Sequence, residues 1–463
     1  MSSWQISKKP IELPYSMSIE MELQMLTKDG LFLSEEKIIP HMQKMVEDTT
    51  ELFLKDLDTP TFPQLIKDRI AGEPYATQKA NKGSIVSLNY NNQKKAMEID
   101  LYKRVAPSIL AVMTPHCTIL DELVWWCQKL ISIAEQALPK DIFLISTGLN
   151  PIQQITAGSS CGAYYQIGNF KSDKEKINAY DMIRNFIPHI IALSANSPFI
   201  NGAPTGEVKV TDRQYACPEC IRSNRLQYDV SMFSQTDPNY YIPYLPPHQT
   251  LDYFLDIIRK PSLEEARFQD IIPFSELGTI DLRICDAQLS IARTIGIALI
   301  IEALALAASE MKSIPDAGSQ SLVVNRDSAI SNGLFGMFSV ETIPFREMMK
   351  ENPKFTEFYL GNIKKNKLHA HLFEAVQNML LLLRDILKRE RFIETPFLTP
   401  ILLSVFDDID IAKAPFTEAE YQLHLYLARQ HDISAVLKDL ILLTVKCCED
   451  PSYSPIFGTV KSY

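Results

Sequence analysis

The chain has 463 residues, a hydrophobic content of 46%, a charged content of 22% and a formal net charge of −10. This composition is typical of a folded globular protein. The acidic balance argues against nucleic acid or an anionic membrane surface as the main partner. The eight cysteines are too sparse for a disulfide framework, and the N-terminus has no signal-peptide pattern. We therefore expect a cytoplasmic location.

The N-terminal half alternates between strand and helix patterns. Two strands joined by a turn at Lys28-Asp29-Gly30 are predicted within 11–34. Further strands are predicted at 84–90, 108–114, 142–146 and 162–168. Helical spacing predicts helices at 35–57, 118–138 and 174–195, the last with a kink at Pro188.

The C-terminal half is mostly helical. Segment 196–250 is rich in Pro, Gly, Asn and Tyr, so we expect a loop that covers the functional site and moves more than the sheet. The most apolar run, 295–308, contains Glu302 and is too short to span a bilayer, so we expect a buried core helix and no membrane partner. The other predicted elements are a strand at 279–284 and helices at 291–312, 369–390, 418–429 and 433–448.

Two predicted strands carry charges on alternate positions. In Thr279-Ile280-Asp281-Leu282-Arg283 the alternation sends Asp281 and Arg283 to one face and apolar side chains to the other. Near the N-terminus, Glu20 and Glu22 alternate in the same way with Ile19, Met21 and Leu23. These strands indicate a sheet with a charged face suited to binding a metal, although a solvated sheet face has the same pattern.

Other motifs carry little chemistry. Cys217-Pro218-Glu219-Cys220 lacks the second ligand pair that a structural zinc site needs, so we interpret it as a loop. His369-Ala370-His371 is predicted to open a helix, where residues i and i+2 point apart, so we interpret both histidines as surface residues. The phosphate-binding P-loop, the dinucleotide fingerprint and the nucleophile elbow are absent from the sequence.

Four segments, in order, resemble the glutamate–cysteine ligase type 2 (carboxylate–amine ligase) family of the glutamine synthetase superfamily. The first is Ser18-Ile19-Glu20-Met21-Glu22-Leu23, which is similar to the family's G-x-E-x-E strand, and the second is 161–168, which is similar to its H-x-H-x-G or Q-x-N strand. The third is 192–199 with Gly202 and Thr205-Gly206, which is the most specific match. The fourth is 279–283 with Asp286, which is similar to the family's T-x-E-x-R-x-x-D segment. A weaker fifth match is Asn325-Arg326 with Ala329 and Gly333-Leu334.

The resemblance implies an α+β fold with a curved antiparallel sheet of about six strands, near the usual number for a sheet, and helices on its outer face. It implies a catalytic core at 1–345 and a helical layer at 346–463 that completes the core. It also implies an ATP-dependent ligase in which a carboxylate, most commonly that of glutamate, becomes an acyl phosphate and an amine then forms an amide bond. Mg²⁺ or Mn²⁺ would serve as cofactor. A homodimer is one option for the assembly.

The resemblance also implies roles for individual residues. The metal ligands would be Glu20, Glu22, Gln166 and Asp281. Arg283 would be catalytic and would contact phosphate, as would Gln166 and Arg213, the latter a loose match to the family's S-x-R arginine. Arg104 and Tyr164 would contact substrate. We expect Glu20, Glu22, Gln166, Asp281 and Arg283 to converge on one face of the sheet.

The chain departs from the family on the acceptor side. Ala111 and Arg104 stand where the family has acids, Tyr164 stands where it has a histidine, and Asp281 is shorter than the family's glutamate. Three interpretations follow: an active ligase with an altered acceptor, a protein that binds nucleotide or amino acid without catalysis, and a structural protein on an old enzyme scaffold. We favour the first, because Glu20, Glu22, Gln166 and Arg283 keep their register.

Overall fold

The structure is a computed structural model. It describes residues 9–33, 109–153, 160–211, 214–216, 219–227, 270–272, 278–339, 369–406, 416–456 and 458–459, with short pieces at 52, 55, 59–60, 63–64, 84–87, 98–101, 249–250 and 252–253. The predicted helix at 35–57 lies almost wholly outside these residues, as do Arg104, Arg213 and Cys217.

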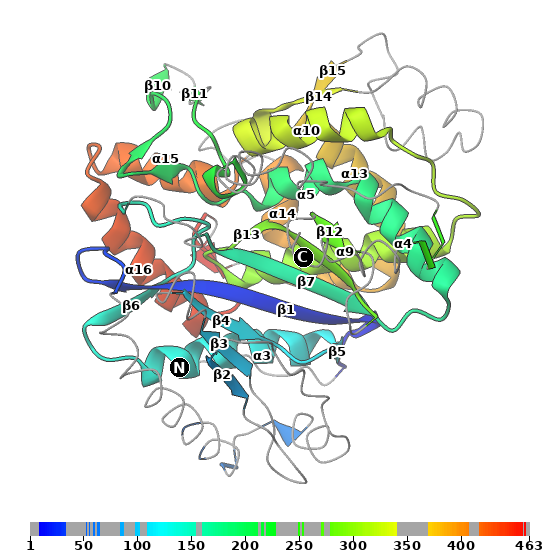
Figure 1. The fold of residues 1–463 in the computed structure, drawn as a ribbon, viewed down its shortest axis with the longest axis horizontal. Coiled ribbons are helices and arrows are strands. Elements are labelled where there is room, and N and C mark those ends of the chain that lie inside the picture. The colour runs from blue at the N-terminus through cyan, green and yellow to red at the C-terminus, as the bar shows by residue number, and fades with distance from the viewer. Residues whose placement is uncertain are drawn as a thin grey trace.

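One antiparallel sheet organises the described part of the chain, where it has nine strands (Figure 1). Seven follow the order β12-β13-β7-β1-β4-β3-β2, and β5 and β6 pair with the two ends of β1. Their bounds are β1 Glu12–Thr27, β2 Ser84–Ser87, β3 Glu98–Leu101, β4 Ile109–Met113, β5 Cys117–Ile119, β6 Ile142–Ile145, β7 Gly162–Gly168, β12 Ile271–Ile272 and β13 Ile280–Asp286. The predicted α+β class and antiparallel sheet are confirmed, with more strands than expected.

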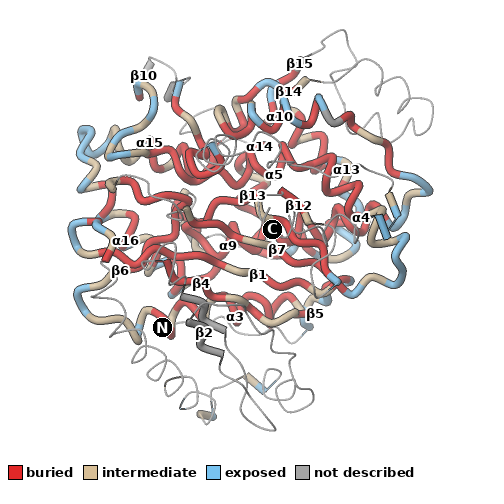
Figure 2. The backbone as a smooth tube through the Cα atoms, in the orientation of Figure 1, coloured by how far each residue is buried: buried red, intermediate tan, exposed pale blue. Residues whose placement is uncertain are grey.

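The helices cover the apolar face of this sheet. The main buried cluster joins Ile19, Met21 and Leu23 of β1 to side chains from the helices, and Figure 2 shows buried backbone through the centre of the molecule. The helices are α3 Leu120–Ala137, α4 Asp173–Asn185, α5 Ile187–Ser194, α9 Ile291–Ser309, α10 Ser319–Asn332, α13 Leu372–Arg389, α14 Thr399–Phe406, α15 Glu418–Ala428 and α16 Ile433–Glu449. The predicted boundary at 345 falls outside the described residues, and the cluster includes side chains from both sides of it.

Helix α9 is the central core helix. By length and composition it could cross a membrane, but its apolar stretch is wholly buried within the fold. The predicted core helix is confirmed, although the expectation that it would be too short to span a bilayer is wrong. A buried Glu302 lies within it and accepts a hydrogen bond from the backbone N–H of Tyr15 at 2.6 Å. Burial raises the pKa of Glu302 to about 8.

Three local predictions need correction. The segment 11–34 is one long strand followed by the turn, and Phe32 adds a single bridge to Leu26. The predicted helix 174–195 is two helices that break at Phe186, because Pro188 is compatible with the first turn of a helix and incompatible with its interior. His369–His371 forms strand β15, paired with β14 (Met337–Ser339), and the helix begins after it.

The C-terminal helices are fixed to the core by buried carboxylates. Glu418, at the start of α15, accepts hydrogen bonds from the backbone N–H groups of Leu289 at 2.6 Å and Ser290 at 3.2 Å. Glu420 forms a buried ion pair with Arg222 at 2.8 Å. Because an uncompensated buried charge is costly, Glu418 keeps α15 against the loop that precedes α9, and Glu420 keeps it against the segment that contains Arg222.

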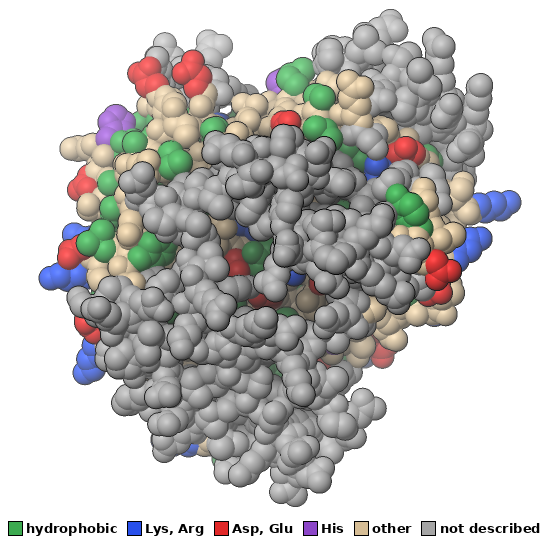
Figure 3. Space-filling view, viewed as in Figure 1, with side chains coloured by type: hydrophobic (Ala, Val, Ile, Leu, Met, Phe, Trp, Pro, Cys, Tyr) green, Lys and Arg blue, Asp and Glu red, His purple; other side chains and the backbone are tan. Residues whose placement is uncertain are grey.

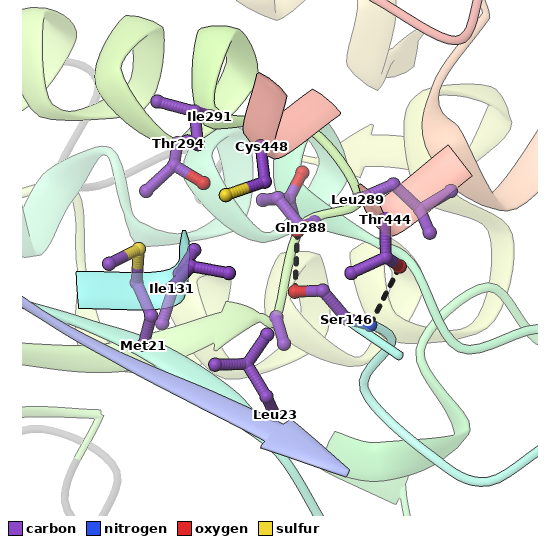
Figure 4. A pocket seen from close by; sticks show the side chains of 12 residues that line it. Met21, Leu23, Ile131, Ser146, Gln288, Leu289, Ile291, Thr294, Thr444 and Cys448 are labelled. Carbon is purple, nitrogen blue, oxygen red and sulfur yellow. Dashed lines mark hydrogen bonds between the residues drawn. The ribbon is translucent and has the colours of Figure 1, made fainter. Parts of the chain in front are cut away.

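A small cavity lies on the core side of β1 (Figure 4). Met21 and Leu23 line it together with Ser146, Gln288 and Thr444, and its volume is about 10 Å³. The hydroxyl of Ser146 donates to the backbone oxygen of Gln288 at 2.7 Å, and the backbone N–H of Ser146 donates to the hydroxyl of Thr444 at 3.2 Å. A cavity of this size is at the lower limit for holding one water molecule. The cavity is therefore a packing defect of the core rather than a substrate site.

Gly296 tests the packing of α9 against α14. A Cβ at this position would collide with the backbone oxygen of Phe397 and would lie 2.8 Å from Cδ1 of Ile401. Helix propensity alone would make Gly296→Ala stabilising by about 1 kcal/mol. We expect instead a loss of about 1–3 kcal/mol in the free energy of unfolding, since overpacking displaces the neighbouring segment. Urea denaturation measures the sign, and a gain in stability would contradict this packing.

Candidate functional site

The face of the sheet opposite the helices carries the predicted site. Because Ile19, Met21 and Leu23 are in the core, Glu20 and Glu22 point to the other face. In the strand register Glu20 lies opposite Tyr164 of β7. This face therefore starts with two glutamates and a tyrosine on adjacent central strands.

The next strand adds the remaining predicted residues. Gln166 of β7 lies between Ser18 of β1 and Asp281 of β13. The register shifts between Leu282 and Cys285, so that Arg283 and Ile284 face the single residue Tyr164. The register thus places Glu20, Glu22, Gln166, Asp281 and Arg283 on one face, while their roles stay predictions.

Glu22 is the most deeply buried of these acids, at 4% exposed. Its Oε2 accepts hydrogen bonds from the N–H of Gly162 at 2.6 Å and from the hydroxyl of Tyr164 at 3.0 Å. Burial raises the pKa of Glu22 above its ordinary value, and the charge of Glu20 raises it further, whereas Arg225 opposes the shift. A carboxylate desolvated beside a second carboxylate is suited to binding a cation.

Two arginines flank the ring of Tyr164. The guanidinium carbon of Arg283 lies 5.5 Å from the ring centroid, and that of Arg225 lies 5.7 Å from it. Both are within the range of cation–π attraction. Burial raises the pKa of Tyr164, and so does the neighbouring Glu22. Tyr164 therefore donates a hydrogen bond to Glu22 through its neutral hydroxyl, and its ring contacts the guanidinium groups of Arg225 and Arg283. Figure 3 shows acidic and basic side chains near each other close to the centre of the molecule.

Arg225 is a site residue that the sequence interpretation missed. Arg213, which was predicted to match the family's S-x-R arginine, lies outside the described residues, as does part of the predicted covering loop. Ser223-Asn224-Arg225 has the S-x-R spacing, and this string is the signal that identifies Arg225. Arg225 donates to the backbone oxygens of Cys285 at 3.0 Å and Arg283 at 3.2 Å. Arg225 is therefore a second candidate for the family's S-x-R arginine, while the role of Arg213 stays a prediction.

Asp286 connects Arg225 to the loop that follows α5. Its carboxylate accepts hydrogen bonds from the N–H of Asn196 at 2.8 Å, the hydroxyl of Ser197 at 2.7 Å and the hydroxyl of Ser223 at 2.9 Å. Arg225 lies 3.7 Å from the same carboxylate. Burial raises the pKa of Asp286, and Arg225 opposes this shift. The segment 192–199, which is the most specific match to the family, thus ends in a loop that Asp286 holds against β13.

The donor atoms on this face fit a hard cation. Asp281 is 5% exposed and accepts a hydrogen bond from the hydroxyl of Thr279 at 2.6 Å. The buried Oε1 of Gln166 has no hydrogen-bond partner of good geometry among the described residues. Within this described set, no group of three or more His, Cys, Asp or Glu side chains is arranged to hold an ion by itself. A cation here would complete its shell with Gln166, substrate oxygens and water, as Mg²⁺ commonly does.

Strand β3 adds two acidic positions that the sequence interpretation did not use. In its register with β4, Glu98 lies opposite Met113 and Asp100 lies opposite Ala111. Met113 in turn lies opposite Glu20, and Ala111 lies opposite Glu22. The register therefore puts two acidic positions one strand beyond the neutral Ala111, while Arg104 lies outside the described residues.

The buried Glu22 gives a pH dependence that stability measurements detect. Because its pKa is raised in the folded state, the folded chain keeps a proton that the unfolded chain loses near pH 4.5. The free energy of unfolding should therefore fall as pH rises above about 4.5, until Glu22 ionises in the fold. Glu22→Gln should flatten this decline. Glu12→Gln, at an exposed position of the same strand, is the control, and equal pH profiles for both variants would contradict the burial argument.

Comparisons with known proteins find similarity in the central part of the chain. Residues 152–333 match the family described as Glutamate-cysteine ligase family 2 (GCS2). A protein described as "Putative glutamate--cysteine ligase 2" from Legionella pneumophila is 30% identical over 220 residues, which are 45% of this chain and 53% of that protein. One with the same description from Ralstonia pickettii is 25% identical over 231 residues, which are 44% of this chain and 56% of that protein. The chain thus matches about half the length of these curated relatives.

A solved structure supports the fold over a longer span. The crystal structure of glutamate–cysteine ligase from Francisella tularensis in complex with AMP superposes with a TM-score of 0.52 at 11% identity, covering 97% of this chain and 90% of that one. The family match does not include the strand at 18–23, which the sheet register joins to the matched segment. The predicted resemblance is confirmed: the chain is similar to glutamate–cysteine ligase family 2 in its central sequence and has the fold of a glutamate–cysteine ligase.

Proposed function

We propose that the protein is an ATP-dependent ligase that forms a carbon–nitrogen bond between an amino-acid carboxylate and an amine. The observation that carries the proposal is the buried Glu22, which shares one sheet face with Glu20, Gln166, Asp281 and Arg283. A face with both acids and guanidinium groups suits a triphosphate with its cation. The family similarity supports the same class of activity.

Four residues would hold the divalent cation: Glu20, Glu22, Gln166 and Asp281. The unpartnered oxygen of Gln166 and the desolvated carboxylate of Glu22 both favour a cation at this face. When bound, the cation would offset negative charge on the phosphates. The carboxylate and amide donors suit Mg²⁺ or Mn²⁺.

The proposed reaction has two steps. An oxygen of the substrate carboxylate attacks the γ-phosphorus of ATP, ADP leaves, and an acyl phosphate forms. The amine nitrogen then attacks the acyl carbon, phosphate leaves with the C–O bond pair, and the nitrogen loses a proton as the amide forms. Arg283 would contact the transferring phosphoryl group, where its planar fork matches phosphate oxygens. Tyr164 and Arg225 would fix the side chain and backbone of Arg283 for this contact.

The acceptor side sets this chain apart from its relatives. Ala111 offers no ligand beside Glu22, whereas the register brings Asp100 opposite Ala111. We therefore propose an altered acceptor, with Arg104 contacting an anionic group of a substrate. Glutamate is the proposed carboxylate donor by family analogy alone.

Phosphate release with a panel of amino acids and amines tests the ligase directly. We expect release that requires ATP, a divalent cation and both a carboxylate and an amine substrate. Arg283→Ala should lower turnover by about 10²-fold or more, because a donor aimed at developing charge is worth that much. Arg384→Ala, an exposed arginine on α13, is the matched control and should keep full turnover. Unchanged turnover in Arg283→Ala would contradict the proposed role.

Binding without turnover is the second candidate function. The absence of a three-acid metal cluster among the residues that can be described favours it. A ligand that binds only the folded state raises the apparent melting temperature. A thermal shift with MgATP, in the absence of any phosphate release, would identify a nucleotide-binding protein that has lost catalysis. If MgATP neither raises the melting temperature nor gives phosphate release, both candidate functions are contradicted.

A further inference from the structure

His116 lies at the edge of the site, just after β4. The preceding Thr114 is fixed to β1 by three hydrogen bonds. Its N–H donates to the backbone oxygen of Ile19 at 3.0 Å, its hydroxyl accepts from the N–H of Ile19 at 2.9 Å, and its backbone oxygen accepts from the hydroxyl of Ser18 at 2.7 Å. The backbone that carries His116 is therefore held beside Ser18.

The register places His116 on the site face. Cys117 lies opposite Met17 of β1, and both side chains are in the core. Since successive side chains of a strand alternate, the residue before Cys117 faces the same side as Ser18. Ser18 lies opposite Gln166, which lies opposite Asp281. His116 therefore joins a row of polar side chains that crosses three strands.

Three buried polar atoms in this row have no hydrogen-bond partner among the residues described. They are Nδ1 and Nε2 of His116 and Oε1 of Gln166. The side chains of His116 and Gln166 are close enough to interact, but not in a good hydrogen-bond geometry. A buried polar group without a partner costs about 1–3 kcal/mol, so three of them indicate that something else satisfies them.

The donor set identifies the missing partner. Both ring nitrogens of His116 are buried and lack a hydrogen-bond partner of good geometry among the described residues, and an imidazole nitrogen is a common metal ligand. An imidazole nitrogen, an amide oxygen and the carboxylate of Asp281 are a mixed nitrogen and oxygen set. Nitrogen ligands favour transition-metal ions, whereas Mg²⁺ prefers oxygen alone.

We propose that His116 is a further ligand of the divalent cation held by Gln166 and Asp281, and that this nitrogen ligand makes the site bind Mn²⁺ in preference to Mg²⁺. The imidazole comes from the turn after β4, and not from the family's histidine positions in β7, which here hold Tyr164 and Gln166. The site deepens the proposed function, since the ion would bind next to Glu20 and Arg283.

Electron paramagnetic resonance of the full-length protein with Mn²⁺ alone tests the site. Pulsed measurements should detect ¹⁴N coupling from an imidazole nitrogen in the wild type and in His424→Gln, which changes an exposed histidine on α15. The coupling should disappear in His116→Ala, whose Mn²⁺ affinity should fall by more than about tenfold, since even groups that only orient a ligand are worth about 10- to 100-fold. Bound Mn²⁺ without nitrogen coupling in the wild type would overturn the proposal.

A second variant separates the ligand from the fold. His116→Asp replaces the nitrogen ligand by oxygen, so the ratio of Mn²⁺ to Mg²⁺ affinity should fall while an ion still binds. An unchanged ratio would count against His116 as a ligand. The two proposals can fail separately. If Mn²⁺ binds with nitrogen coupling but no phosphate is released, the metal ligand is supported and the ligase activity is contradicted. If phosphate release requires a cation but His116→Ala does not change Mn²⁺ binding, the ligase activity is supported and His116 as a ligand is contradicted.

Discussion

The register of β1 is the constraint on which the rest of the structure depends. This strand pairs with β4 and β7 on its two sides, and one of its faces is committed to the helical core. A shift of one residue would send Ile19 and Met21 into the charged face and Glu20 and Glu22 into the core. The hydrophobic effect therefore fixes the positions of the acids, although it acts on the opposite side of the strand.

Burying charge on the polar face has a cost, which the neighbours of Glu22 offset. Gly162 and Tyr164 donate hydrogen bonds to it, and Arg225 opposes the effect of burial on its pKa. Such a group is destabilising in the absence of a ligand and becomes favourable when a cation binds. Perturbed acids in a polar cluster are typical of functional sites, and here they coincide with the segments that resemble the ligase family.

The sequence predicted the elements whose periodicity is strong. Gly162–Gly168 and the starts of α9 and α16 agree with the prediction, because a two-sided strand and a long apolar helix have unambiguous patterns. The site face was predicted from alternation and family motifs. Arg225 was missed because the S-x-R arginine was sought just after Thr205-Gly206, whereas the proximity of Arg225 to Tyr164 is visible only in the fold. The break at Phe186 and strand β15 depend on tertiary packing, which short sequence windows do not contain.

The bulge in β13 has a consequence for how this chain tolerates change. Asp281 lies before the register shift and Asp286 lies after it, and both face the site. In a regular strand, two residues that are five positions apart would point to opposite faces. One extra residue thus lets a single strand contribute both to the candidate site and to the contact with the loop that follows α5. Regular pleating over the same residues, without the bulge, would turn one of these aspartates into the core. The spacing of Asp281 and Asp286 therefore works only with the bulge, which makes this irregularity a part of the site.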